Sequence, residues 1–534
     1  MDREQKRNLL ILTSIGLVVF VLFIFPNLKG AQTAAMLSVF EIDEFAQFPN
    51  LIGMLTPGDT LIQSARNFLI YLHYFYGYPF YFMSALAALP VKILYGTVWQ
   101  QHTAELVLVL RQAINVAPMI ISAGLLTYIQ TRFRDLPRTV GIFVFLLIFP
   151  AVVVNNLWWH PDSLGVLSAV MILFFLDQDH LRLGKFFYFA AAACGLAVGI
   201  KYTGVFFGLA IPVYIGWSWV GQKFPFRRAA GATAAFVGIM LAMVVISNPL
   251  LVLPQERTAI IETQKLQFEQ TSLGILQTNP QPYFNTKEYP EDFRLHYGEL
   301  EFIMLALAAL FVGLLLSPKR WYYAVLLAWL VPLVLTINFS ATRRTHYFLP
   351  VVLPLVACFT VLLPGKGKPE DENRVQTSSV VQWVTIALIV YQGALFLPQD
   401  FAIYSKALIK EETSPSIAFY KEIQAALPVG FADKKRVVFH DWKVYFPPSA
   451  NMLTEMNWDM PTLKYIYQIN PDVILLDKEN INLFFSPESV EQAVNKGNMQ
   501  AVHEFYLAAK EKLIPGYQVF FENSFGVGFL RKSD

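Results

Sequence analysis

Two adjacent carboxylates, Asp43 and Glu44, follow the first long apolar segment of the chain, in the stretch FEIDEF. A carboxylate held beside a membrane can act as a general base toward a hydroxyl group if its surroundings place it against that hydroxyl. The simpler interpretation is an acidic surface loop or a helix N-terminus, because most polar loop residues have no catalytic role. The remaining sequence has to decide between these two interpretations.

Three further segments carry side chains that could join this chemistry. NNLWWHPDSLG holds His160 and Asp162 between two apolar segments, and Asp162 is equally suited to be a helix N-cap. One histidine and one aspartate are a weak metal signal. GIKYTG holds Lys201 and Tyr202, and a lysine at a helix end often only extends to the lipid headgroups. His73, in the aromatic stretch YLHYFYGYPFYF, is a further candidate.

The segment FSATRRTHYFLP adds a paired basic group. Its candidate residues are Arg343, Arg344, His346 and Tyr347. The planar guanidinium donates two parallel hydrogen bonds, which suits a phosphate group. Binding of ordinary lipid phosphate at the membrane surface is the alternative interpretation.

The composition identifies the class of protein that holds these residues. Of 534 residues, 55% are hydrophobic and 15% are charged, with a net charge of +2. Soluble proteins carry about 25% charged residues, so the chain is predicted to be a polytopic α-helical membrane protein without a nucleic-acid partner. Cys194 and Cys358 lie in apolar segments, so neither a disulfide nor a metal cluster is expected.

Eleven apolar segments are long enough to span a bilayer. They are 8–26, 104–130, 139–155, 162–177, 186–200, 203–220, 229–247, 300–317, 321–338, 346–364 and 380–398. A twelfth segment, 78–96, contains Pro90 and Lys92. Counting it as a span would move the later Arg and Lys clusters outside, against the positive-inside rule, so it is predicted to lie along the membrane surface. The motif DQD at 177–179 is interpreted as a solvated cytoplasmic helix end.

This topology predicts a cytoplasmic N-terminus in the plasma (inner) membrane and two domains. Residues 1–399 form the membrane domain, with outer loops at 27–103 and 248–299, and residues 400–534 form a small extracytoplasmic α/β domain. In that domain RVVFH and DVILL are predicted strands, PESVEQAVNKGNMQAVHEFYLAAKEKL is a predicted helix, and YQVFFENSFGVGFLRK is a predicted hairpin.

The outer face therefore collects carboxylates, cations and aromatic side chains, with Asp43 predicted to face Lys201 and Arg343. This combination suits transfer of a group from a phosphate to a hydroxyl, because a base can take the hydroxyl proton while a cation stabilises the phosphate. Nucleotide-activated donors are confined to the cytoplasm, so a lipid-anchored phosphate donor is expected. A lipid or solute transporter (flippase) is the alternative, disfavoured because no internal repeat is visible.

In their order along the chain, IDE, YGYPFYF, GIKYTG and RRTHYFLPVVLPLVA resemble the GT-C glycosyltransferases over residues 8–400. The most similar branch is the bacterial protein O-mannosyltransferase and aminoarabinose-transferase-like group. The resemblance implies inverting transfer of a sugar, a mannose-like hexose or another, from a polyprenyl-phosphate donor to a hydroxyl of a protein, lipid or glycan at the outer face of the membrane.

The same resemblance implies roles for individual residues. Asp43 would be the catalytic base with Glu44 beside it, and Lys201 and Arg343 would lie near the lipid phosphate. A divalent cation, Mg²⁺ or Mn²⁺, is left open as a cofactor. The stretch YGYP (Tyr76 to Pro79) departs from the Glu-Lys-Pro-Pro-like stretch of the aminoarabinose transferases, which argues against lipid A as the acceptor.

Overall fold

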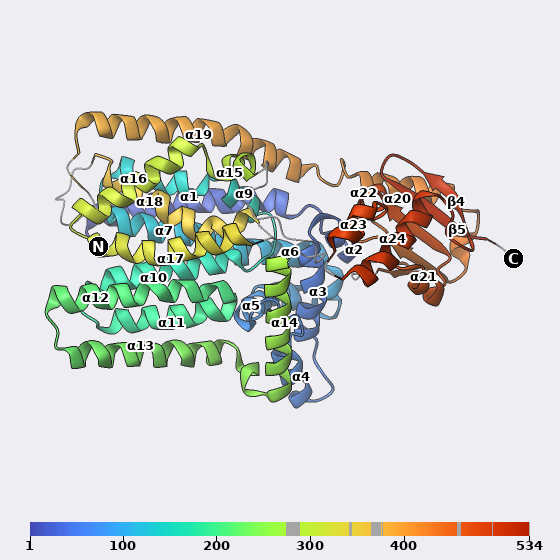
Figure 1. Ribbon diagram of the computed structural model, residues 1–534, viewed down its shortest axis with the longest axis horizontal. Helices are drawn as coiled ribbons and strands as arrows, with labels where there is room; N and C mark the ends of the chain where they lie inside the picture. Colours follow the sequence, from blue (N-terminus) through green and yellow to red (C-terminus); the bar gives the residue numbers. More distant parts are fainter. Residues whose placement is uncertain are drawn as a thin grey trace.

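The computed structural model describes residues 1–273, 289–340, 344–364, 375, 377–456, 461–493 and 495–532. They form two parts that lie end to end (Figure 1). One part is a bundle of long helices that lie side by side, and the other is a small sheet with helices, reached through the C-terminal end of α19 (Ser379–Leu408). The N-terminus lies at the end of the bundle that is far from the sheet.

The apolar segments predicted to span the membrane are helical along most of their length. In chain order these elements are α1 (Arg3–Asn27), α6 (Thr103–Arg111), the π turn η2 (Gln112–Val116), α7 (Ala117–Thr131), α8 (Leu136–Leu147), α9 (Pro150–Asn155), α10 (Asp162–Asp179), α11 (Lys185–Ile200), η3 (Tyr202–Leu209), α12 (Ala210–Gln222), α13 (Phe226–Ser247), α16 (Leu300–Leu316), α17 (Arg320–Phe339), η6 (Thr345–Phe348), α18 (Leu349–Ala357), η7 (Cys358–Val361) and α19.

Seven of the described helices are long and apolar enough to cross a membrane, and an eighth qualifies if Glu291–Tyr297 and Leu300–Leu316 are taken as one bent span. α1 shows why such helices are stable in lipid. Asp2 caps its first turn by accepting a hydrogen bond from the Gln5 N–H, and apolar side chains such as Leu10 and Leu17 remain exposed on its outer face. The eleven-span topology stays a prediction, since several of its segments form helices that are shorter than those counted here as long enough to cross a membrane.

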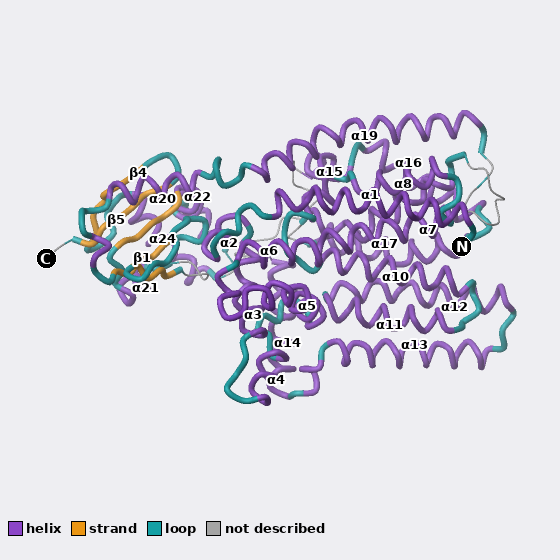
Figure 2. The backbone as a smooth tube through the Cα atoms, turned by 180° about the vertical axis from the view of Figure 1, so that it is seen from behind, coloured by secondary structure: helices purple, strands orange, loops and turns teal. Residues whose placement is uncertain are grey.

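A group of helices lies at the end of the bundle that faces the sheet. They are α2 (Ala34–Phe40), α3 (Ile42–Leu55), α4 (Leu61–Leu69), α5 (Tyr78–Tyr95) and α14 (Pro254–Leu273). α14 runs across the direction of the bundle helices, and α5 lies beyond the end of α11 in both views (Figures 1 and 2). Residues 78–101 also pass the test of length and composition for a span, so the surface position predicted for 78–96 stays a prediction.

The loops predicted to be cytoplasmic meet at the other end of the bundle, where the N-terminus lies. The Gln5 side chain donates to the Arg132 carbonyl at 2.8 Å, and Arg132 and Lys319 both pair with Asp177, at 2.5 and 3.2 Å. Arg132 and Lys319, from two of the basic clusters in the described part of the chain, therefore lie at the same end as the N-terminus, in agreement with the alternation of eleven spans. Which side of the membrane that end faces stays a prediction.

The motif at 177–179 corrects the sequence interpretation. Asp177 and Asp179 are buried, and Asp179 accepts hydrogen bonds from the backbone N–H groups of Leu183 and Gly184 and from the Tyr214 hydroxyl. The prediction of a solvated helix end is wrong, because ion pairs and backbone donors from neighbouring loops replace water around both carboxylates.

The C-terminal part is a five-stranded sheet in the order β2-β1-β3-β5-β4. Its strands are β1 (Arg436–His440), β2 (Met452–Glu455), β3 (Val473–Asp477), β4 (Tyr517–Glu522) and β5 (Gly526–Arg531), and its helices are α20 (Pro415–Ala426), α21 (Leu463–Ile469), α22 (Lys478–Phe484), α23 (Pro487–Gln492) and α24 (Lys496–Lys510). β1, β2 and β3 are parallel, and the hairpin β4–β5 adds to β3 in antiparallel register.

The predicted strands and hairpin of this part are confirmed. The single helix predicted over 487–513 is instead two, α23 and α24, and β2 was not predicted. β2 lies at the edge of the sheet and has only four residues, which is too short for a clear strand pattern in the sequence. The division of the chain at residue 399 stays a prediction, and α19 runs past it to Leu408.

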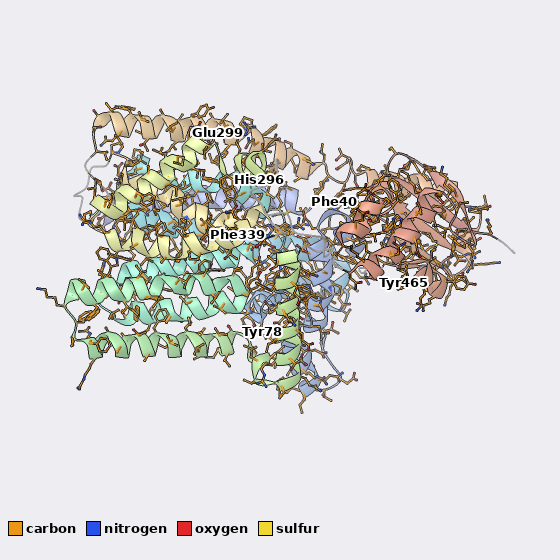
Figure 3. All side chains as sticks on the ribbon, viewed as in Figure 1. Phe40, Tyr78, His296, Glu299, Phe339 and Tyr465 are labelled. Atoms are coloured by element: carbon orange, nitrogen blue, oxygen red, sulfur yellow. The ribbon has the colours of Figure 1, made fainter. Side chains whose placement is uncertain are left out.

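The segment after α19 is tied to the first outer loop. Lys29 pairs with Glu412 at 3.1 Å, and the Gly30 N–H donates to Glu411 at 2.5 Å. Figure 3 shows Phe40, at the end of α2, between the bundle and the sheet domain. The start of the tail therefore contacts the segment that leads into α3.

The topology can be tested by the reactivity of single cysteines. Arg227 and Lys434 are exposed, whereas the native Cys194 and Cys358 are buried. With a membrane-impermeant maleimide on intact cells, we expect Lys434→Cys to be labelled and Arg227→Cys to be labelled only after permeabilisation. The parent chain serves as the background control, and labelling of both sites from the same side would contradict the eleven-span topology.

Candidate functional site

Asp43 and Glu44 lie in the first turn of α3, where the N-terminal end of the helix dipole favours negative charge. Consecutive helical residues point about 100° apart, so the two carboxylates face different surroundings. The Asp43 side chain is 46% exposed, whereas that of Glu44 is fully buried. Only Asp43 is therefore open to a substrate.

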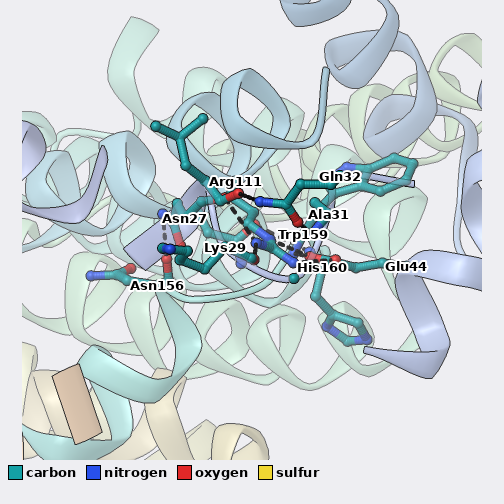
Figure 4. A network of polar contacts seen from close by, with 12 residues as sticks. Asn27, Lys29, Ala31, Gln32, Glu44, Arg111, Asn156, Trp159 and His160 are labelled. Carbon is teal, nitrogen blue, oxygen red and sulfur yellow. Dashed lines mark hydrogen bonds and ion pairs between the residues drawn. The ribbon is translucent and has the colours of Figure 1, made fainter. Parts of the chain in front are cut away.

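Glu44 is held by a buried ion pair with Arg111. The guanidinium donates twice to the carboxylate, from Nε at 2.8 Å and from Nη2 at 2.6 Å, and the backbone N–H of Trp159 donates a third hydrogen bond at 2.6 Å. Figure 4 shows these contacts converging on Glu44. A carboxylate with this many donors is fixed in place, which also fixes the neighbouring turn that carries Asp43.

Arg111 joins segments that are far apart in the sequence. Its Nη1 donates to the carbonyls of Asn27 and Lys29 at 2.8 and 3.0 Å. It is the last residue of α6, and the π turn η2 follows at once and places Asn115 at the site. Sequence analysis missed Arg111, although a single arginine inside an apolar segment is a recognised signal of a functional position.

His160 lies between Asp43 and the interior of the site. Its Nε2 is 3.9 Å from the Asp43 carboxylate and 2.6 Å from the Tyr76 hydroxyl. The ring stacks on Trp158 with centroids 4.1 Å apart, and the backbone N–H donates to Asn115 at 3.1 Å. His160 belongs to the loop that joins α9 to α10, and both its ring and its backbone are therefore held in place.

Asp162 is the centre of a buried charged group. Its Oδ1 accepts from Lys201 Nζ at 2.8 Å, and its Oδ2 contacts His160 Nδ1 and lies 3.4 Å from His346 Nε2. The Lys201 ammonium also lies over the Tyr347 ring, 4.7 Å from its centroid. Side chains from α10, from the end of α11 and from η6 thus meet around the Asp162 carboxylate.

These contacts decide two open interpretations. Asp162 is not a helix N-cap. The N-cap of α10 is Pro161, Asp162 is the first residue of the helix, and its side chain bonds to Lys201. Lys201 is buried rather than extended toward lipid headgroups. The contacts from Asp43 to Lys201 run through His160 and Asp162, so the two residues do not face each other directly.

The aromatic loop before α5 packs closely on the segment that carries Lys201. The Gly77 N–H donates to the Ile200 carbonyl at 3.0 Å, and a Cβ on Gly77 would lie 1.5 Å from the Gly199 carbonyl oxygen. Only glycine allows this approach of two backbones. Tyr76 and Lys201 are thereby brought to the same site by the backbone itself.

A cavity lies behind the charged group. Its polar wall includes Asp162, Lys201, Tyr202, His346 and Tyr347, its apolar wall includes Val166, Phe206, Phe207, Leu333 and Ile337, and α14 contributes Gln267 and Thr271. The cavity therefore offers charged and hydroxyl groups to a small polar group such as a phosphate, next to apolar side chains.

The remaining candidates differ in position. Tyr202 and Tyr347 line the cavity. His73 accepts or donates a hydrogen bond at 2.6 Å with the Tyr81 hydroxyl, and burial lowers the pKa of His73 to about 4, so it is neutral at pH 7. Arg344 is exposed, and Arg343 lies outside the described residues.

Three side chains could hold a metal ion together. One ligand atom each from His160, Asp162 and His346 lies within 4.8 Å of the others. His160 Nδ1 and Asp162 Oδ2 are buried in contact with each other, and Asp162 Oδ2 lies 3.4 Å from His346 Nε2, so the three ligand atoms face one another. Imidazole nitrogen and carboxylate oxygen suit Zn²⁺ and Mn²⁺, so the residues fit a divalent cation. The sequence alone offered His160 and Asp162, and His346 comes from a distant segment.

Neither a family model nor a curated protein matches the sequence. The fold is nevertheless similar to that of a solved structure. ArnT from Cupriavidus metallidurans, bound to undecaprenyl phosphate, has a TM-score of 0.52 at 11% identity over 98% of this chain and 97% of that chain. The Archaeoglobus fulgidus oligosaccharyltransferase in the apo form has a TM-score of 0.49 at 12% identity over 98% of this chain and 74% of its own. The likeness shows that this chain shares the fold of ArnT over nearly its whole length, in agreement with the polytopic helical fold that the sequence resemblance implied.

The ion pair beneath Asp43 yields a test of stability. Arg111→Leu leaves Glu44 buried without its partner, and we expect a loss of about 3–5 kcal/mol in the free energy of unfolding. The double variant Glu44→Leu/Arg111→Leu should recover much of that loss, because no charge is left buried alone. Thermal unfolding of the purified protein in detergent measures both.

Glu105→Gln is the matched control on the same helix. Glu105 is partly exposed and, among the described residues, its ion pair is with His102 at 3.5 Å, so its removal should change stability by less than about 1 kcal/mol. Equal stability of Arg111→Leu and the parent chain would show that the pair does not hold α3.

Proposed function

We propose that this protein is a glycosyltransferase that moves a sugar from a polyprenyl-phosphate donor to a hydroxyl of an acceptor, with inversion at the sugar carbon. The observation that carries the proposal is the half-exposed carboxylate of Asp43, next to the buried Glu44–Arg111 pair and 3.9 Å from His160 Nε2. His160 contacts Asp162, which pairs with the buried Lys201, and Asp162 and Lys201 line the cavity. The fold shared with ArnT, which was crystallised with undecaprenyl phosphate, supports the same class of donor.

Asp43 is the general base in this proposal. Its carboxylate takes the proton of the acceptor hydroxyl as the oxygen attacks the anomeric carbon of the sugar. The new bond joins the acceptor oxygen to that carbon, and the bond from the carbon to the phosphate oxygen breaks. Because attack and departure occur on opposite faces, the configuration inverts. Glu44 acts by positioning, since its own oxygens are occupied by Arg111 and Trp159.

The leaving polyprenyl phosphate carries the negative charge that develops. Lys201 is the buried cation at this site, and its partner Asp162 and the ring of Tyr347 orient it. A fixed charge in a site that excludes water stabilises such a leaving group more than it would in water. Arg344 and Arg343, in the same outer segment, remain candidates for contacts to the phosphate from the exposed side.

A divalent cation fits His160, Asp162 and His346, and when bound it would supply a further positive charge for the phosphate. Of these three side chains, His160 also contacts Asp43, at 3.9 Å, and its hydrogen bond with Tyr76 keeps the ring in one orientation. The sugar expected from the sequence resemblance is a mannose-like hexose, and the acceptor hydroxyl belongs to a protein, lipid or glycan.

Asp43→Asn tests the base. With purified protein and a panel of radiolabelled polyprenyl-phosphate sugars, we expect the variant to lose transfer by about 100-fold or more, because the amide cannot accept the proton. The variant should fold normally, since the Asp43 side chain is half exposed. Asp59→Asn, an exposed aspartate of the same outer loop, is the matched control and should retain full transfer. Full transfer by Asp43→Asn would exclude it as the base.

Metal binding has its own test, independent of transfer. At a Mn²⁺ concentration of about 100 Kd, binding should add about 2.7 kcal/mol to the free energy of unfolding of the parent chain. His346→Ala should lose most of this increment. His296→Ala removes a histidine whose Nδ1 contacts the Asp292 carbonyl of its own helix, so it should keep the increment. The same increment in all three proteins would place the metal elsewhere.

A further inference from the structure

α14 contributes one wall of the cavity. The helix crosses the end of the bundle in front of α5 (Figure 1), and its Gln267 and Thr271 line the same space as Lys201 and His346. The cavity is about 70 Å³, room for a few water molecules. Only a small polar part of a donor, such as one hydroxyl or the phosphate oxygens, fits beside these side chains.

α14 is docked on the aromatic loop by two polar contacts. The Tyr74 hydroxyl hydrogen-bonds to Glu256, and Gln264 Nε2 donates to the Tyr74 carbonyl at 2.7 Å. Gln267 is three residues after Gln264, and residues three apart lie on the same face of a helix. The contacts that fix Gln264 therefore also direct Gln267 toward the cavity.

Gln267 differs from the hydroxyl residues that share the cavity. Thr271 donates to the Gln267 carbonyl at 2.8 Å, Thr336 donates to the Pro332 carbonyl at 2.8 Å, and Ser340 donates to the Thr336 carbonyl at 2.7 Å. These hydroxyls are already used within their own helices. Gln267 Oε1 is buried, yet no hydrogen-bond donor of the described residues reaches it. A buried acceptor without a donor costs free energy unless a ligand supplies the hydrogen.

The chemistry of that ligand follows from the atom. A carboxamide oxygen only accepts hydrogen bonds, and the oxygens of a phosphodiester have no hydrogen to give. A sugar hydroxyl is a donor of the right size for the space. Lys201, which lines the same cavity, is the cation that the proposed function assigns to the phosphate.

We propose that Gln267 determines donor specificity by accepting a hydrogen bond from one hydroxyl of the donor sugar. This inference rests on the proposed function of the site. It assigns α14 a direct contact with the sugar, whereas Asp43 acts on the acceptor hydroxyl and Lys201 on the phosphate.

The test compares Gln267→Leu with the parent chain on polyprenyl-phosphate donors that each lack one sugar hydroxyl. We expect Gln267→Leu to lower kcat/KM for the complete donor about tenfold, the scale of one hydrogen bond. One deoxy donor should be transferred equally well by both proteins, since the hydroxyl that Gln267 binds is already missing from it. The KM for the acceptor should not change.

Gln255→Leu makes the same substitution at an exposed position of α14 and should leave every value unchanged. Binding of polyprenyl phosphate without a sugar should be equal in all three proteins, which also shows that Gln267→Leu is folded. An equal loss with every deoxy donor, or a change confined to the acceptor KM, would overturn the role of Gln267. If the parent chain transfers no sugar from any polyprenyl phosphate, the proposed function itself fails.

Discussion

The site depends on one buried ion pair, that of Glu44 and Arg111. Both side chains are fully buried, so each charge is stable only because the other is present. The pair fixes the first turn of α3 with two parallel hydrogen bonds, and Trp159 adds a third from the loop that carries His160. Asp43 can stay half exposed and still be immobile because its neighbour is held in this way.

The same ion pair explains why the site is built from loops without being flexible. Arg111 also binds the carbonyls of Asn27 and Lys29, so the end of α1, the start of α3 and the end of α6 share one guanidinium. The π turn after Arg111 places Asn115 where it holds the backbone of His160. π turns inside helices occur often at functional positions, and here the turn serves two contacts at once.

Much of this arrangement follows from the sequence, and the reasons for the exceptions are physical. The charge clusters and apolar lengths predicted the helices, and the adjacent carboxylates predicted Asp43, because both signals are local. His346 and Asp162 meet only through the packing of α18 against α10, which no local pattern contains. The structure excludes the alternative for Lys201, extension to the lipid headgroups, because Lys201 is buried beside Asp162, and that burial cannot be read from its place at a helix end. Arg111 was visible as a charge in an apolar segment, but its partner was not. Gln267 could not be singled out from the sequence, since it is one of several glutamines on a polar helix.

The ion pair between Lys29 and Glu412 and the hydrogen bond between Gly30 and Glu411 attach the start of the tail to the segment that follows α1. Arg111 also donates a hydrogen bond to the carbonyl of Lys29, so the tail and the Glu44–Arg111 pair contact the same short segment. The start of the sheet domain is thus attached close to the proposed base, through the short segment between α1 and α2.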